Sequence, residues 1–158
     1  GEVYAMVGAS DRHNLIAGNL FAALRPLVRG TQCQIFMADM KLRLEVPGDE
    51  TFFYYPDLML ACDPTDREPY YRRWPCLLVE VSSPATERID RCEKLFAYMG
   101  LPSLEAYLLL AQDQRQATLH RRADGWSSRR FASGDVPIDC LNMAVALDLI
   151  YEDVTFSS

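Results

Sequence analysis

The chain has 158 residues and is acidic, with 22 Asp and Glu against 16 Lys and Arg and a net charge of −6. Its length and its 49% hydrophobic content are typical of one soluble domain, over residues 1–158, with a hydrophobic core. The acidic balance disfavours nucleic-acid binding, because proteins that neutralise phosphates usually carry a basic excess. No apolar run approaches the roughly 20 residues of a membrane span, and the N-terminal sequence lacks the features of a signal peptide. We therefore expect a cytoplasmic protein with no membrane partner.

The cysteines and arginines are the two residue types whose distribution needs an interpretation. The five cysteines are odd in number and widely separated, without a Cys-x-x-Cys pair, so we expect reduced packing residues. Five arginines fall between positions 115 and 130 with only Asp124 opposing them. They form either a local basic face or a solvated charged hairpin.

The N-terminal part of the chain predicts one strand, one helix and three further strands. Residues 2–6 alternate loosely and suggest a short strand. Ser10 or Asp11 can cap a helix that ends near Val28, because its apolar residues recur at helical spacing. Strands are then predicted at the ranges 32–37, 40–46 and 52–55.

The rest of the chain predicts a sheet with a crossover helix. Apolar strands are expected at 58–61, 77–81 and 104–110, with a polar loop over 62–74 and a helix over 84–99. Two more strands, 117–121 and 126–131, surround a turn, and 141–151 has the pattern of a short packing element. This order predicts an α/β or α+β fold, a mixed β-sheet flanked by helices.

Glu80 is the residue that stands out within this pattern. It lies inside the apolar strand Leu-Leu-Val-Glu-Val, where an unpaired ionised group is very costly, so it needs a partner. The following helix carries Asp90, Lys94 and Tyr98 four residues apart and therefore on one face. A strand carboxylate followed by a turn and a helix lysine suggests the geometry of a site.

Asp57 is the second candidate acid, because it follows Pro56 at the start of the strand 58–61. If the two acidic strands are neighbours, Asp57 and Glu80 form an oxygen-rich site suited to Mg²⁺ or Mn²⁺. Such an ion polarises a phosphodiester and needs a nearby cation, for which Lys94 is the candidate. Two simpler interpretations stay open: Pro-Asp is a common turn dipeptide, and Asp90 with Lys94 can be an exposed ion pair.

Three motifs in order carry a family resemblance: Tyr-Tyr-Pro-Asp-Leu-Met-Leu, the stretch from Pro75 to Tyr98, and Ser-Leu-Glu-Ala-Tyr-Leu-Leu-Leu. With them, nearly the whole chain resembles the Uma-two family, which is described as putative restriction endonucleases and is a branch of the PD-(D/E)xK nuclease superfamily. The resemblance implies a restriction-endonuclease-like fold and metal binding by Asp57 and Glu80. The superfamily lysine normally stands two residues after the second acid. That position is Ser82 here, so the resemblance assigns the role to Lys94 on the helix instead.

The resemblance also implies supporting residues. Glu2 matches a family acid near the N-terminus and is either a further group near the metal or an ordinary exposed acid. His13 is interpreted as a surface or packing histidine in preference to a proton carrier. Glu105 is a candidate to orient the helix lysine or to support the sheet. The Val81 carbonyl is a candidate for a further metal ligand.

The leading functional hypothesis is therefore a metal-dependent phosphodiesterase acting on DNA, with Mg²⁺ or Mn²⁺ as the cofactor. The rival is a catalytically inactive binding or assembly module that keeps the nuclease fold, which the acidic net charge and the missing strand lysine favour. A homodimer is plausible, because cutting two antiparallel strands is simplest with two symmetry-related sites.

Overall fold

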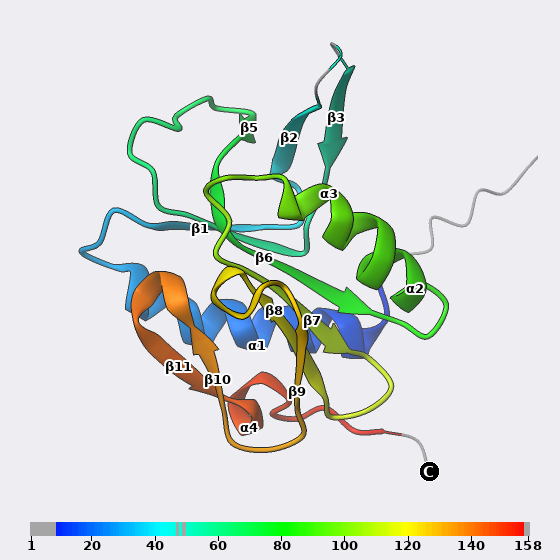
Figure 1. The fold of residues 1–158 in the computed structure, drawn as a ribbon. Helices are drawn as coiled ribbons and strands as arrows, with labels where there is room; N and C mark the ends of the chain where they lie inside the picture. The colour runs from blue at the N-terminus through cyan, green and yellow to red at the C-terminus, as the bar shows by residue number, and fades with distance from the viewer. Residues whose placement is uncertain (1–8, 47, 49, 157–158) are drawn as a thin grey trace, which may run out of the picture.

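The structure, a computed structural model, describes residues 9–46, 48 and 50–156, so the predicted strand at 2–6 lies outside the described residues. A six-stranded mixed sheet forms its centre (Figure 1), and the predicted fold class is confirmed. The strand order is β1-β4-β6-β7-β8-β9, in which β6 and β7 are parallel and the other neighbours antiparallel. These strands are β1 (Gln34–Met37), β4 (Leu58–Ala61), β6 (Pro75–Ser82), β7 (Ala106–Ala111), β8 (Ala117–Arg121) and β9 (Ser128–Phe131).

Helix α1 (Asp11–Val28) has the predicted position and the predicted cap. The Ser10 hydroxyl accepts a hydrogen bond from the His13 backbone N–H at 3.1 Å, which satisfies one of the free N–H groups of the first turn. Ile16, Leu20 and Leu24 recur every four residues and are buried against the sheet. Within the described residues, no helix is long and apolar enough to cross a membrane.

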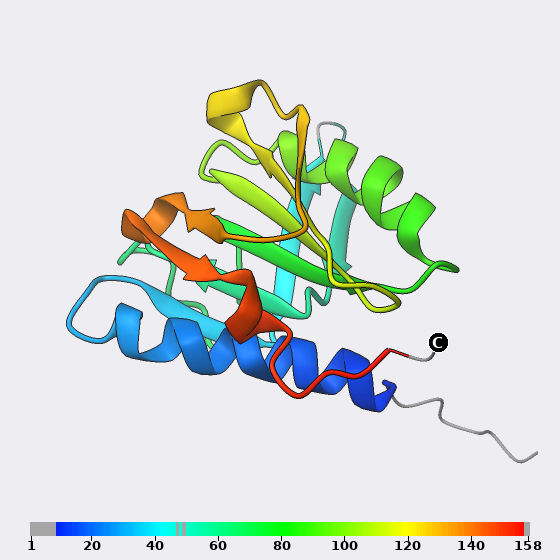
Figure 2. The same cartoon turned by 90° about the horizontal axis from the view of Figure 1, so that it is seen from below.

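The two faces of the central sheet carry different layers (Figure 2). In β6, Leu77, Val79 and Val81 belong to a core that also contains the buried residues of α1. The hairpin of β10 (Asp135–Ile138) and β11 (Met143–Ala146) and the short helix α4 (Leu147–Ile150) pack in the same core. The sequence indicated only a packing element over 141–151, so the hairpin is a finding of the structure.

The opposite face carries a second sheet and a helical segment. The three strands β2 (Lys41–Val46), β3 (Glu50–Tyr54) and β5 (Tyr71–Arg72) form the order β3-β2-β5, and β5 lies in the predicted loop. The helical segment consists of α2 (Glu87–Ile89), a π-helical turn η1 (Asp90–Lys94) and α3 (Leu95–Met99). Leu78 and Tyr107 of the central sheet pack here against Tyr98. Two 3₁₀ turns, η2 (Arg122–Asp124) and η3 (Asp139–Leu141), complete the described elements.

The helical segment differs from the uninterrupted helix predicted over 84–99. Ser83 and Thr86 form reciprocal hydrogen bonds before the segment begins. The Thr86 N–H donates to the Ser83 hydroxyl at 3.3 Å, and the Ser83 N–H donates to the Thr86 hydroxyl at 3.1 Å. Regular helix then begins at Glu87 and is interrupted by the π turn, where Tyr107 OH donates to the Asp90 carbonyl at 3.0 Å. π turns are rare and frequently found at functional sites.

The arginines between 115 and 130 are held largely by local partners. Arg115 pairs with Asp148, and Arg121 pairs with Asp124 at 2.8 Å and with Asp139 at 3.3 Å. Arg122 donates to the carbonyls of residues 104 and 101. These contacts favour the charged-hairpin interpretation over a continuous basic face.

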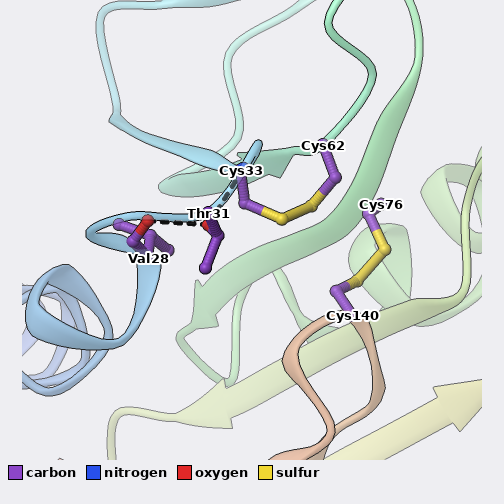
Figure 3. Close-up of a disulfide and its surroundings, with 6 residues drawn as sticks. All are labelled: Val28, Thr31, Cys33, Cys62, Cys76 and Cys140. Atoms are coloured by element: carbon purple, nitrogen blue, oxygen red, sulfur yellow. Dashed lines mark hydrogen bonds between the residues drawn. A yellow bond between two sulfur atoms is a disulfide. The ribbon is translucent and has the colours of Figure 1, made fainter.

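Two disulfides are present, one between the ends of β1 and β4 and one between β6 and the turn η3 (Figure 3), so the prediction of reduced cysteines is wrong for four of the five. Cys33 is bonded to Cys62 and Cys76 to Cys140, while Cys92 is free and exposed. Sequence spacing could not reveal these pairs, because the partners are 29 and 64 residues apart. Cys33 and Cys62 meet through the pairing of β1 with β4, and Cys76 and Cys140 meet where η3 packs beside β6. Disulfides usually persist in oxidising surroundings, so they count against the expected cytoplasmic location.

We expect reduction to destabilise the fold substantially. Closing loops of 29 and 64 residues removes chain entropy from the unfolded state, and each closure is worth about 4 kcal/mol in the entropic model. Urea unfolding with and without dithiothreitol measures the loss. Without reductant, the double variant Cys76→Ala/Cys140→Ala should show part of this loss of stability, because it lacks one of the two disulfides. Cys92→Ala is the matched control and should unfold like the wild type. An unchanged wild-type transition in reductant would contradict the prediction.

Candidate active site

The two candidate acids lie side by side on neighbouring strands. Leu58 pairs with Val79 in the antiparallel ladder of β4 and β6, so Asp57, one residue before β4, lies next to Glu80. The Val81 N–H donates to Asp57 Oδ2 at 2.7 Å. This bond fixes the Asp57 carboxylate against β6, at the point where β4 begins.

Glu80 is buried on the face of the sheet that the helical segment covers. Its side chain is 5% exposed, and its Oε1 lies 3.2 Å from Lys94 Nζ and accepts a hydrogen bond from Tyr98 OH at 3.3 Å. Burial raises the pKa of Glu80 to about 8, although the Lys94 ammonium lowers it; the charges of Asp57 and Asp90 raise it further. The carboxyl therefore holds its proton near neutral pH when no other cation is present.

Lys94 joins Glu80 to a second buried acid, Asp90. The Lys94 ammonium lies 3.1 Å from Asp90 Oδ1, and Ser82 Oγ donates to Asp90 Oδ2 at 2.7 Å. Asp90 is only 4% exposed, so the alternative of an exposed Asp90–Lys94 ion pair is wrong. Burial lowers the pKa of Lys94, but the two carboxylates outweigh it and raise the pKa above the usual value. Lys94 therefore stays charged beside Glu80.

His13 reaches the same group from the first turn of α1. Its Nε2 lies 3.1 Å from Asp57 Oδ1, so His13 contacts a candidate site acid, which the interpretation as a surface or packing histidine did not include. The hydrogen bond to Asp57 raises the pKa of His13; burial opposes this, and the charges of Asp57 and Glu80 add to it. Sequence reasoning missed the contact, because α1 and Asp57 meet only in the folded chain.

The other predicted site residues have different positions. Glu105 does not reach Lys94, because Leu77 pairs with Ala106 and so Glu105 lies near the opposite end of β6 from Glu80. Its side chain is exposed, and its backbone N–H donates to the Cys76 carbonyl at 2.9 Å, which leaves only the sheet-supporting role. Glu2 lies outside the described residues. The Val81 N–H points toward Asp57, and since both backbone groups of a strand residue point to one neighbouring strand, its carbonyl does too.

Two residues of the cluster were not predicted as site residues. Ser82 donates a hydrogen bond to Asp90 and stands at the position where the sequence resemblance led us to expect a lysine, and Tyr107 of β7 donates to the π turn. The sequence could have pointed to Ser82, because a polar residue at the end of a buried strand needs a hydrogen-bond partner. Tyr107 carried no such signal, because an aromatic residue in an apolar strand is ordinary core.

Comparison with known families identifies the family of this chain. Residues 1–149 match the model of the Uma2 family, described as "Putative restriction endonuclease". The chain belongs to the Uma2 family. The resemblance recognised in the sequence motifs is thereby confirmed.

Related proteins and a solved structure agree with this assignment. Uncharacterized protein slr1290 of Synechocystis sp. is 32% identical over 160 residues, which cover 99% of this chain and 83% of that protein. Uncharacterized protein sll1609 of the same organism is 33% identical over 114 residues, covering 71% of this chain and 63% of that protein. A crystal structure from Anabaena variabilis, titled as a putative nuclease of the DUF820 group, shares the fold. Its TM-score is 0.72 with 13% identity, over 90% of this chain and 82% of that one.

Restriction-endonuclease-like families generally use divalent metal ions, and the acids of this Uma2 chain fit such an ion. Carboxylate and carbonyl oxygens are the ligands of Mg²⁺ and Mn²⁺. The mutual repulsion of Asp57 and Glu80, which raises the pKa of Glu80, is what a cation between them would relieve. Within the described part of the chain, no three His, Cys, Asp or Glu side chains are grouped to hold a metal. Two carboxylates suffice for Mg²⁺, because it usually keeps several waters.

We expect Glu80→Gln to keep the fold and to stabilise the metal-free protein at pH 8. The pKa of Glu80 is raised on folding to about 8, from 4.5. The folded state therefore binds the proton more tightly, and this group's contribution to stability decreases as pH rises from 4.5 to about 8. The advantage of the glutamine variant over the wild type should grow across the same range.

Urea unfolding in EDTA at the two ends of that pH range measures the effect. Glu87→Gln is a matched control, since Glu87 lies on the nearby helical segment with an exposed carboxylate. A large loss of stability in Glu80→Gln at pH 8 would mark Glu80 as a structural acid that the fold requires in its charged form.

Proposed function

We propose that this Uma2 protein is a metal-dependent phosphodiesterase of the PD-(D/E)xK type that hydrolyses DNA. The observation that carries the proposal is the convergence of Glu80 and Lys94, 3.2 Å apart, beside Asp57 on the adjacent strand. A structural ion pair alone does not require an acid within the central strand, where burial opposes the charge. In this proposal residues 1–158 form one restriction-endonuclease-like domain.

Asp57 and Glu80, with the Val81 carbonyl, would hold Mg²⁺ or Mn²⁺. A bound divalent ion supplies a Lewis acid that polarises the phosphodiester and lowers the pKa of a water. Asp57 is already oriented for this role by the Val81 N–H, and Glu80 by Lys94 and Tyr98. Lys94 would position the attacking water and stabilise charge on the phosphoryl oxygens.

The position of Lys94 also weakens the rival hypothesis of an inactive module. That hypothesis rests partly on Ser82 at the position of the superfamily lysine. In the structure, the Ser82 hydroxyl bonds Asp90, and Asp90 in turn holds the Lys94 ammonium close to Glu80. A lysine from the helix thus stands where a lysine from the strand would be expected to act.

The oligomeric state and the cellular location are also part of the proposal. A homodimer would supply two symmetry-related sites for the two strands of a duplex. A cytoplasmic location remains the expectation from sequence, although the disulfides count against it.

The decisive experiment is cleavage of supercoiled plasmid by the purified protein during titration with Mn²⁺ or Mg²⁺. We expect nicked and linear products with either ion, none in EDTA, and none from Glu80→Gln at any ion concentration. The binding isotherm for Mn²⁺, measured by calorimetry, should show one tight site per chain.

The control is Glu87→Gln, which removes an exposed acid from the nearby helical segment and should cleave like the wild type. If the wild type neither binds Mn²⁺ nor cleaves DNA or RNA, the inactive-module hypothesis is correct instead.

A further inference from the structure

A cleft of about 190 Å³ lies away from the candidate active site and contains two arginines with unused hydrogen-bond donors. Arg43 and Glu45 of β2 line one side, and Arg73 and Trp74, just before β6, line another. The turn after α3, residues 100–102, closes it.

The guanidinium groups of Arg43 and Arg73 are only partly satisfied. Arg43 Nη1 donates to Tyr71 OH at 3.0 Å, and Arg43 Nη2 lies 3.6 Å from Glu45 Oε1 at the exposed side of the cleft. The Arg73 guanidinium lies 4.5 Å from the centre of the Trp74 ring. Both Nε–H groups are buried, and neither has a hydrogen-bond partner among the described residues. Buried donors are normally paired, and two unpaired arginine donors along one cleft indicate an anionic ligand with oxygen acceptors.

The surface next to the cleft extends this chemistry. Arg43 pairs with Phe53 and Lys41 with Tyr71 across the β3-β2-β5 sheet, so all four side chains lie on its outer face. Lys41 lies 5.5 Å over the Phe53 ring, which is 50% exposed. Lys41 therefore adds a second cation next to the cleft, and basic groups gathered on one surface attract the phosphates of a nucleic acid.

We propose that this cleft binds a phosphate of the nucleic-acid backbone outside the candidate active site, with the guanidinium groups of Arg43 and Arg73 donating to its oxygens. The proposal rests on the proposed function, since it assigns part of the same substrate to a second contact. It also locates a positive region on a chain whose net charge is −6.

The spacing of the two sites suits a duplex. Trp74 and Glu80 lie near opposite ends of β6, and six residues of strand extend about 20 Å. Successive base pairs are about 3.4 Å apart, so a duplex contacting both sites would span about 6 base pairs. Binding should therefore require DNA longer than the site that is cut.

Fluorescence anisotropy with a labelled duplex of about 20 base pairs, in EDTA to prevent cleavage, tests the proposal directly. We expect Arg43→Gln and Arg73→Gln each to raise Kd several-fold and to reduce the slope of log K against log[salt] by about one phosphate contact. Arg25→Gln is the matched control: it removes the same charge from the exposed side of α1 and should bind like the wild type.

A variant that is expected to bind more tightly separates a specific effect on binding from a loss of folding. Glu45 is the acid that lines the cleft, and its side chain is 64% exposed, so Glu45→Gln should fold normally and bind the duplex more tightly. Thermal unfolding of every variant confirms that it is folded.

Four results would overturn the proposal: no duplex binding by the wild type, wild-type affinity in both arginine variants, an equal loss in Arg25→Gln, or weaker binding by Glu45→Gln. A thermal-shift assay with inorganic phosphate distinguishes a site for a small phosphate ligand from a site for the DNA backbone. If the arginine variants lose that shift but keep duplex affinity, the cleft serves a small phosphate ligand and the proposal is wrong. The expected binding pattern without any cleavage would instead contradict only the proposed function.

Discussion

Lys94→Ala should lower the single-turnover rate of DNA cleavage by about two to four orders of magnitude at saturating Mn²⁺. The ammonium of Lys94 lies 3.2 Å from Glu80 Oε1 and is held in place by Asp90, so it is a charge fixed beside the proposed metal. Its loss removes transition-state stabilisation but no metal ligand, so the affinity for Mn²⁺ should remain within a few-fold of the wild type.

Lys94→Arg should restore little of this rate. A planar guanidinium cannot take the position of a compact ammonium between two carboxylates without shifting them. Lys94→Ala should also lose about 1 to 3 kcal/mol of stability, because the buried Asp90 keeps the hydrogen bond from Ser82 but loses its charged partner. Rates are therefore compared on folded protein, with Arg88→Ala as a control on the exposed side of the same segment. Wild-type rates in both Lys94 variants would remove this residue from the site.

Asp57→Asn should abolish cleavage and weaken Mn²⁺ binding by at least about two orders of magnitude. An amide retains an acceptor for the Val81 N–H but is a poor ligand for a hard divalent cation, so the fold should persist while the ion is lost. Calorimetry measures the affinity, and a plasmid assay measures the activity.

The same variant has a second readout in His13. The hydrogen bond to Asp57 is the main cause of the raised pKa of His13, so that pKa should fall toward its ordinary value in Asp57→Asn. An NMR titration of the His13 imidazole signals in the wild type and in Asp57→Asn follows this change. If Asp57 were only a turn residue, the pKa of His13 would still fall, but Mn²⁺ binding would be unaffected. That combination would refute the metal-ligand role.

The sequence by itself predicted the central elements that carry the candidate site. An acid inside a continuous apolar strand identified Glu80, because burial there is costly without a partner. The four-residue spacing placed Asp90, Lys94 and Tyr98 on one helical face, and all three contact the Glu80 cluster. The predicted pairing of the Asp57 and Glu80 strands is confirmed by the antiparallel ladder of β4 and β6. These features are local, so periodicity and composition suffice to detect them.

Only the tertiary structure decided the contacts between distant segments. His13 meets Asp57 across 44 positions of sequence, the disulfides join residues 29 and 64 apart, and Glu105 is separated from Lys94 by the register of β6 with β7. The π turn likewise depends on Tyr107, which donates to it from another strand. Strand register and helix docking follow from the packing of the whole core, and no local pattern contains that information. The sequence therefore indicates which residues need partners, and the fold determines which partners they find.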